Sequence, residues 1–215
     1  METTITTARG NVLLRPSRRE DATAYRDLRL AALQRSPAAF GADYASSAAR
    51  PLSFWEERMA QGALGEQGVT YLALAGDALI GMTSLVRNTL AKTQHSAAIF
   101  GVYVSPDWRG AGVADGLMAA CLAQGRALGL RVVRLGVVTT NTSAIRLYLR
   151  HGFTVYGVER EALVVDGVSH DELLMACRLW DAAGPSTSRL VRAVWRRIER
   201  PGRGGSGSRR KRAAA

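Results

Sequence analysis

The chain has 215 residues, a formal net charge of +11 and a hydrophobic fraction of 47%. This is enough for one soluble domain with a sizeable core, and no apolar run reaches the roughly 18–20 residues that span a bilayer. The N-terminus lacks the basic-then-apolar order of a secretion signal, and neither the two cysteines nor the three histidines have metal-ligand spacing. These features argue against a transmembrane segment and a metal site, and they favour a reducing, cytoplasmic location.

The first sixty residues predict a short strand and two helices. Both helices begin at capping-box patterns, at residues 17–20 and 53–56. In chain order we expect a strand at 12–14, a helix from 17 to about 34, a loop, and a short helix from 53 to about 62.

The middle and end of the chain alternate apolar strands with two helices. A hairpin turns at Gly76-Asp77 and a second one at Asp166-Gly167. We expect strands at 69–74, 79–87, 97–104 and 132–138, helices at 112–128 and from Asn141, and a last hairpin ending near Leu179. A crossover helix separates strands 97–104 and 132–138, so these two strands should run parallel.

A turn and a glycine-rich loop join strand 97–104 to the next helix. This order leaves main-chain N–H groups of residues 110–114 unpaired at a helix N-terminus, where the helix dipole favours an anion. Arg109 adds a cation, and Gly110 and Gly112 remove the side chains that would keep a phosphate away from the backbone. The segment is therefore predicted to bind a pyrophosphate.

The motif residues that this loop lacks exclude two common types of phosphate-binding loop. The loop lacks the Gly-Lys-Ser/Thr of a Walker motif, and its glycines at 110, 112 and 116 are one residue out of step with a dinucleotide fingerprint. Arg109-x-x-Gly112-x-Ala114 instead resembles the acetyl-CoA loop of the GNAT (GCN5-related) N-acetyltransferase superfamily.

A second segment strengthens this resemblance. Asn141-x-x-Ala144-x-x-Leu147-Tyr148, followed by Gly152-Phe153, is similar to a GNAT segment at the same distance from the loop. The alternative is an ordinary helix, capped at its start, with Ile145 and Leu149 packed inward and Gly152 at its end. The two segments together, in this order, favour the GNAT interpretation.

The resemblance implies a fold and a cofactor site. The fold is α/β (α+β): one GNAT domain over residues 1–180, with a mixed, mostly antiparallel, twisted sheet, a splayed parallel pair at its centre and about four helices. Acetyl-CoA would be the co-substrate, its pantetheine arm lying between the splayed strands. The implied cofactor-binding residues are Val102, Tyr103, Val104, Arg109, Gly110, Ala111, Gly112, Val113, Ala114, Asn141, Ala144 and Tyr148.

The catalytic groups are less completely defined. By resemblance, Tyr148 is the general acid that protonates the coenzyme A sulfur, and the alternative is a half-buried tyrosine with a packing role. Some relatives carry a glutamate, a candidate general base, twelve residues before this tyrosine, where the chain has Gly136. The base is therefore unassigned: proton transfer through water, His95, Asp43 and Glu159 all stay open.

The resemblance leaves two possible functions. The first is acetyl-CoA-dependent N-acetylation of a primary amine, on a small molecule or a protein, by direct attack in a ternary complex. The second is a GNAT-like acyl-CoA-binding module with weak or no catalysis. The acceptor entrance would be lined by Phe40, Tyr44, Trp55, Arg87 and Tyr156, for each of which core packing is the alternative.

Residues 181–215 form a basic C-terminal extension. Ten of them are basic against Asp181 and Glu199, which places +8 of the net charge there. An amphipathic helix is predicted over residues 187–199, followed by a disordered tail. The extension could bind an anionic membrane surface or nucleic acid. The alternative is docking on the domain itself or on a second subunit, as in a homodimer.

Overall fold

The computed structural model describes residues 2–63 and 65–179, so the predicted helix at 187–199 and the rest of the C-terminal extension lie outside the described residues. The strands are β1 (Thr3–Thr7), β2 (Gly10–Pro16), β3 (Gly68–Ala75), β4 (Ala78–Arg87), β5 (Ser96–Val104), β6 (Val132–Val138), β7 (Thr154–Val165) and β8 (Val168–Arg178). The α-helices are α1 (Ala22–Arg35), α2 (Tyr44–Ala48), α3 (Leu52–Gln61), α4 (Val113–Ala127) and α5 (Thr142–Arg150). Short 3₁₀ helices are η1 (Arg19–Asp21), η2 (Pro37–Ala39) and η3 (Pro106–Trp108).

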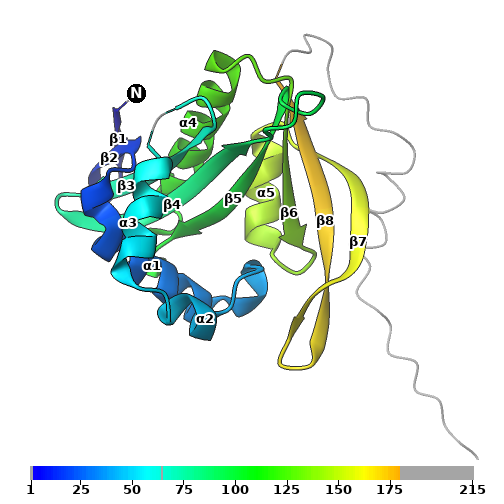
Figure 1. The fold of residues 1–215 in the computed structure, drawn as a ribbon, viewed down its shortest axis with the longest axis horizontal. Helices are drawn as coiled ribbons and strands as arrows, with labels where there is room; N and C mark the ends of the chain where they lie inside the picture. The colour runs from blue at the N-terminus through cyan, green and yellow to red at the C-terminus, as the bar shows by residue number, and fades with distance from the viewer. Residues whose placement is uncertain (1, 64, 180–215) are drawn as a thin grey trace, which may run out of the picture. The chain divides into compact units, whose positions relative to one another are not determined.

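The eight strands form one sheet in the order β1-β2-β3-β4-β5-β6-β8-β7 (Figure 1). Only β5 and β6 pair in parallel, and every other neighbouring pair is antiparallel. The predicted mixed sheet with a central parallel pair is therefore confirmed, with five described α-helices around it where about four were expected.

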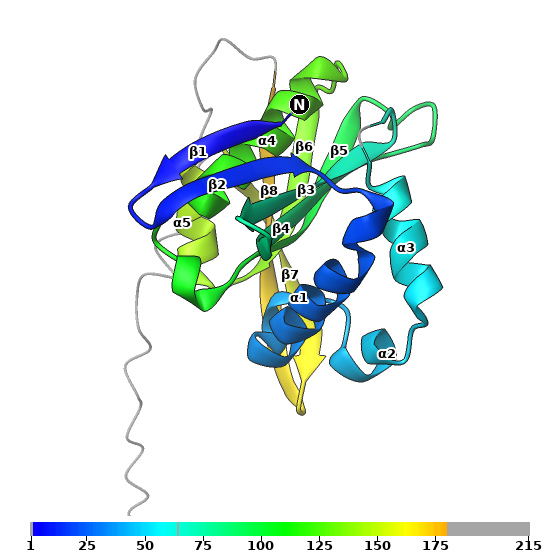
Figure 2. The ribbon, with the colours of Figure 1, turned by 90° about the vertical axis from the view of Figure 1, so that its left-hand side faces the viewer.

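Helices cover both faces of the sheet. Figure 2 shows α1, α2 and α3 on one side of the strands and α4 and α5 on the other. The core on the first side joins α1 and α3 to β3, β4 and β5, and it contains Tyr25, Trp55, Met59, Leu72, Met82 and Tyr103. On the other side, Leu117, Met118 and Cys121 of α4 are completely buried. Burial of this much apolar surface is the main force that fixes the layers.

The parallel pair opens after three residue pairs. Strands β5 and β6 are paired only from Ser96–Val132 to Ala98–Arg134, although both strands continue (Figure 1). Gly101, with φ +64°, lies where the register between β4 and β5 shifts. Such a β-bulge bends the strand that carries it, so β5 follows β4 while β6 follows β8. The predicted splay has this local cause.

Both predicted capping boxes are wrong. The Ser17 hydroxyl is buried and donates a hydrogen bond to the Met59 carbonyl oxygen at 2.9 Å, so it caps no helix. The Asp21 carboxylate instead accepts from the Arg18 N–H at 2.7 Å, and α1 begins only at Ala22. Helix α3 begins one residue before Ser53, with no side-chain cap.

The N-terminal strand and one short helix were not predicted. Strand β1 pairs with β2, and the predicted loop contains α2, in which the Ser46 N–H donates to the Asp43 carboxylate at 2.8 Å. Of the two residues that the ordinary-helix alternative packs inward, Ile145 is buried and Leu149 is 40% exposed.

Candidate active site

The loop before α4 has the geometry of an anion site. Gly110 and Gly112 have φ values of +76° and +82°, and a Cβ atom built at either position would meet no atom within 4 Å. Gly112 caps α4, and the first helical bond runs from the Gly116 N–H to the Gly112 carbonyl oxygen. Within the described residues, no main-chain N–H of residues 110–115 donates a hydrogen bond. This leaves a row of free donors at the positive end of a helix dipole.

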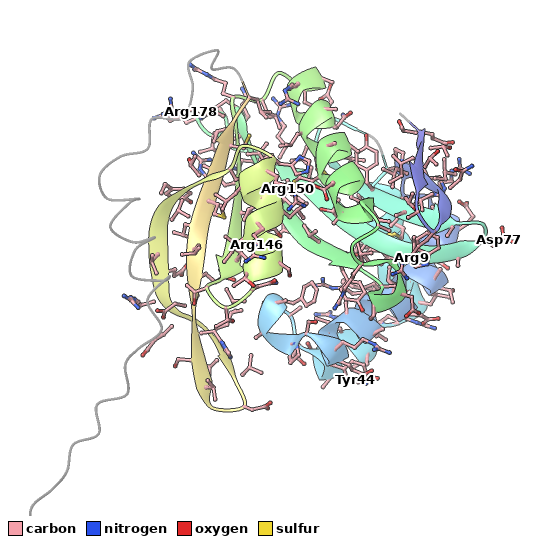
Figure 3. The ribbon with its side chains drawn as sticks, turned by 180° about the vertical axis from the view of Figure 1, so that it is seen from behind. Arg9, Tyr44, Asp77, Arg146, Arg150 and Arg178 are labelled. Carbon is pink, nitrogen blue, oxygen red and sulfur yellow. The ribbon has the colours of Figure 1, made fainter. Side chains whose placement is uncertain are left out.

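Arg109 holds this loop against the end of β5. Its Nε donates to the Val104 carbonyl oxygen at 3.1 Å, and its guanidinium lies 5.6 Å from the centre of the Tyr103 ring. Arg9, which Figure 3 labels and which lies in the β1–β2 turn, donates to the Asp107 carbonyl oxygen just before the loop. Two cations therefore support the loop, and Arg109 does so from inside the predicted site.

An acidic side chain in the first turn of α4 is neutralised from α5. Asp115 forms an ion pair at 2.9 Å with Arg150, which Figure 3 labels on α5, and a hydrogen bond with His151 at 3.2 Å. A carboxylate at a helix N-terminus would otherwise compete with an external anion for the dipole. The sequence motifs did not single out these residues, because the contact joins positions 35 and 36 residues apart.

The splay leaves one edge of β5 without a strand partner in the described structure. Pairing with β6 stops at Ala98, so Val102, Tyr103 and Val104 follow on an open edge. The main-chain groups of such an edge can pair with an extended ligand in the way an added strand does. The structure thus places the predicted strand residues and the predicted loop residues next to one another along the chain and in space.

Helix α5 starts at the other predicted segment. The Asn141 carboxamide oxygen accepts from the Ala144 N–H at 3.2 Å, so this side chain caps the helix. Tyr148 is 6% exposed, and its ring packs on Phe153 with 5.9 Å between centroids. Burial raises the pKa of the Tyr148 hydroxyl. The phenol is protonated at neutral pH, as an ordinary tyrosine also is, so it can act only as a proton donor there.

The three candidate bases have different surroundings. Hydrogen bonds from Ser46 lower the pKa of Asp43, which is the cap of α2. His95 directly precedes β5 at the end where β5 and β6 are paired, on the far side from the loop. Glu159 on β7 stands opposite Glu172 on β8. Of the three, only Glu159 belongs to the part of the sheet beyond the β5–β6 pairing.

The residues expected at the acceptor entrance differ in their location and burial. Phe40 lies beside β5, with its ring 6.5 Å from that of Tyr103 and the Arg29 guanidinium 4.5 Å above it. Trp55 is buried in the core, and the Arg87 side chain donates to the Gln94 carbonyl oxygen in the β4–β5 connection. Tyr44 and Tyr156 are exposed. The packing alternative therefore holds for Trp55, and Phe40 remains the best-placed candidate.

The described residues contain neither a metal-binding cluster nor a membrane-spanning helix. No group of three or more His, Cys, Asp or Glu side chains that could hold a metal ion comes together there. None of the described helices is long and apolar enough to cross a membrane.

Comparison with known proteins identifies the family. The acetyltransferase (GNAT) family model matches residues 31–153, more than half of the chain, and the protein belongs to this family. No curated protein matches the chain.

Solved structures share the fold at low identity. A GNAT acetyltransferase from Streptococcus pneumoniae superposes with a TM-score of 0.71 at 20% identity, over 78% of this chain and 99% of that one. A phosphinothricin acetyltransferase from Sinorhizobium meliloti in complex with AcCoA gives 0.69 at 19%, over 86% and 95%. A ribosomal-protein-alanine N-acetyltransferase from Brucella melitensis gives 0.63 at 21%, over 77% and 99%.

Proposed function

We propose that the protein is an acetyl-CoA-dependent N-acetyltransferase that acts on a primary amine of a small molecule or a protein. The observation that carries this proposal is the row of free N–H groups at residues 110–115, next to the open edge of β5. The bare Gly110 and Gly112 give a diphosphate access to these donors. The S. meliloti relative, which contains AcCoA, has the same fold.

Each part of the site has a role in this function. The N–H groups of residues 110–114 would hold the pyrophosphate, and Val102 and Val104 would pair with the pantetheine arm. Tyr103, Arg109, Asn141 and Ala144 would line the same site. Acetyl-CoA supplies an activated acyl group as a thioester. A main-chain N–H near the splay would stabilise the charge that develops on the carbonyl oxygen, and Tyr148 would protonate the sulfur as it leaves.

Two further elements of the proposal concern location and partners. Cys121 and Cys177 are buried free thiols, which fits a reducing, cytoplasmic environment. The basic extension over residues 181–215 is proposed to contact an anionic surface or nucleic acid through its net charge of +8.

Calorimetry and a thiol-release assay test the function. Coenzyme A and acetyl-CoA should both bind, and free thiol should appear when a panel of primary amines is added with acetyl-CoA. Binding without turnover for any amine would favour the acyl-CoA-binding module. Absence of binding by either form of the coenzyme would overturn the proposal.

A further inference from the structure

A carboxylate fills the space above the bare Gly136. A Cβ atom built on Gly136 would lie 2.5 Å from Oε2 and 3.2 Å from Cδ of Glu172, and the nearest atoms it meets all belong to that side chain. Glu172 lies on β8, where it pairs with Val138 of β6. Because Gly136 has no side chain, the Glu172 carboxylate of the neighbouring strand β8 can lie over it. Strand β6 itself carries no carboxylate at this place.

This carboxylate lies in the splayed part of the sheet. Gly136 comes two residues after Arg134, the last residue of β6 that pairs with β5. Counting on from the Ala98–Arg134 pair places Phe100 of β5 abreast of Gly136, across the opening. Phe100 is 55% exposed, so the β5 side of the opening presents an accessible apolar side chain.

The register also identifies the face on which Glu172 lies. Met82 belongs to the core beneath α1 and α3. Ser84, two residues further along β4, shares the face of Met82 and pairs with Phe100. Ala98, two residues from Phe100, lies on the same face and pairs with Arg134 of β6. Alternate residues of β6 put Gly136 and Val138 on this face too, and Val138 pairs with Glu172 of β8. Glu172 therefore lies on the α1–α3 face, where η2, just before Phe40, approaches β6 and β7.

The Glu172 carboxylate is free to take a proton. It forms no hydrogen bond or ion pair with any residue in 2–63 or 65–179, whereas its neighbour Asp171 binds Arg160 and the Glu161 N–H. Burial, and then repulsion from Glu159 directly opposite on β7, raise the pKa of Glu172. The other ionisable side chains close by on the packed strands are His170 on β8, Arg134 on β6, and Arg160 and Glu161 on β7, whereas η2 carries none. Of these, Arg160 pairs with Asp171.

We propose that Glu172 is the general base of the acetyl transfer, reaching from β8 over Gly136 to the acceptor amine; this rests on the proposed function. The acceptor R–NH₃⁺ gives one proton to the Glu172 carboxylate. The nitrogen lone pair forms the C–N bond as the C–S bond breaks, and the electron pair of that bond leaves with sulfur. The second nitrogen proton is lost as the thiolate gains one, so the products are the amide, the free thiol and a protonated Glu172 that returns its proton to water. The facing Glu159 adds negative charge that attracts a cationic acceptor.

The primary test is Glu172→Gln, assayed with two acceptors. With an amine that is protonated at neutral pH, kcat/KM should fall about 100-fold or more, the usual size of a general-base effect. With an amine of low pKa that is already neutral, the loss should be much smaller. The affinity for acetyl-CoA and the melting temperature should match those of the wild type.

Two variants at Gly136 test the geometry without relying on Glu172→Gln. Gly136→Ala should push the carboxylate aside and lower kcat/KM while Glu172 is still present. Gly136→Glu combined with Glu172→Ala returns a carboxylate to the same space and should recover part of the activity lost in Glu172→Ala alone. Glu159→Gln should shift the acidic limb of the kcat/KM profile to lower pH, because it removes the repulsion that raises the pKa of Glu172.

The outcomes separate this assignment from the function on which it rests. A wild-type protein that acetylates amines, with Glu172→Gln equally active or equally impaired toward neutral and charged acceptors, overturns the role of Glu172 alone. A wild-type protein that binds acetyl-CoA and acetylates no amine overturns the proposed function and the role of Glu172 with it.

Discussion

Tyr148 is buried and, like any tyrosine near neutral pH, carries its proton, so it can act as an acid and not as a base. Its hydroxyl forms no hydrogen bond with the described residues that would compete for this proton. Tyr148→Phe should therefore lower kcat about 100-fold, the lower range of general-acid effects, with acetyl-CoA affinity nearly unchanged. Steady-state kinetics and calorimetry measure the two quantities.

The exposed Tyr156 of β7 offers a control for this substitution. Tyr156→Phe should leave both kcat and affinity near the wild-type values. If Tyr148→Phe weakened binding of the coenzyme without changing kcat, the assignment of Tyr148 as the acid would be wrong.

At the opposite end of the chain, the Arg15–Asp21 ion pair is a stability determinant at the scale of single residues. Both oxygens of Asp21 accept from the guanidinium at 2.6 and 2.7 Å, and the two side chains are 9% and 14% exposed. Asp21→Asn should lower the free energy of unfolding by about 3 kcal/mol, because it leaves the Arg15 charge buried and unpaired. The exposed Asp27, paired with Arg26, is the control, and its Asn variant should change stability by less than about 1 kcal/mol.

The same pair gives stability a defined pH dependence. Burial raises the pKa of Asp21, but hydrogen bonds from Arg15 and from the Arg18 N–H outweigh it, and the net pKa is lowered. The contribution is therefore complete above the ordinary carboxyl pKa of about 4 and is lost as pH falls through the lower folded value. Urea unfolding at pH 7 and at acid pH should show the difference between wild type and Asp21→Asn shrinking. A difference that grows on acidification would contradict this account.

At the scale of elements, the two ends of α4 provide a matched pair of glycines. Gly112 at the start and Gly129 beyond the end have φ values of +82° and +67°, and neither has an atom within 4 Å of a built Cβ. An alanine at either position should reduce stability by about 1 kcal/mol through backbone strain.

Only the substitution at the start of the helix should affect coenzyme binding. Gly112→Ala disturbs the N–H groups that are proposed to bind the phosphates, so acetyl-CoA affinity should fall about tenfold, or about 1.4 kcal/mol. Gly129→Ala should leave affinity unchanged in the same calorimetric experiment. Equal affinities for the two variants would show that the loop does not hold the coenzyme.

The elements that were predicted correctly are those determined by neighbouring residues in the sequence. The apolar run of β6 and the Asp166-Gly167 turn need no information from elsewhere, and the structure has both where expected. Strand β1 was missed because Ile5 is its one apolar residue, and its role becomes visible only where Ile5 meets Gly116 of α4.

The errors and omissions involve residues that act across the chain. Ser17 has the local sequence of a helix cap, but its hydroxyl is used 42 residues away, at Met59. The carboxylate over Gly136 could not be predicted either, because it depends on the register between β6 and β8. The sequence therefore predicted the strand, loop and helix starts that form the candidate site, whereas the position of Glu172 needed the pairing of distant strands.

At the scale of the whole molecule, the charge is divided unevenly. Residues 181–215 carry +8 of the net +11. Truncation after Leu179 should abolish low-salt binding to a DNA duplex and to anionic vesicles, and the full chain should lose that binding as salt rises.

The truncated chain should keep its fold and its coenzyme affinity. Leu179 itself is retained, because its side chain packs over Gly125 and its N–H donates to the Arg131 carbonyl oxygen. A full-length protein that binds neither anionic probe at low salt would remove the reason for assigning the extension an anionic partner.

The donors before α4 and along the open edge of β5 belong to the peptide backbone, which every amino acid except proline supplies in full. A grip made in this way tolerates replacement of almost all surrounding side chains, as long as the glycines keep the chain bent. The proposed acceptor contacts at Phe40 and Glu172 are side chains, each of which a single substitution can remove. In this proposal the coenzyme side resists sequence drift, while the acceptor side can change one residue at a time.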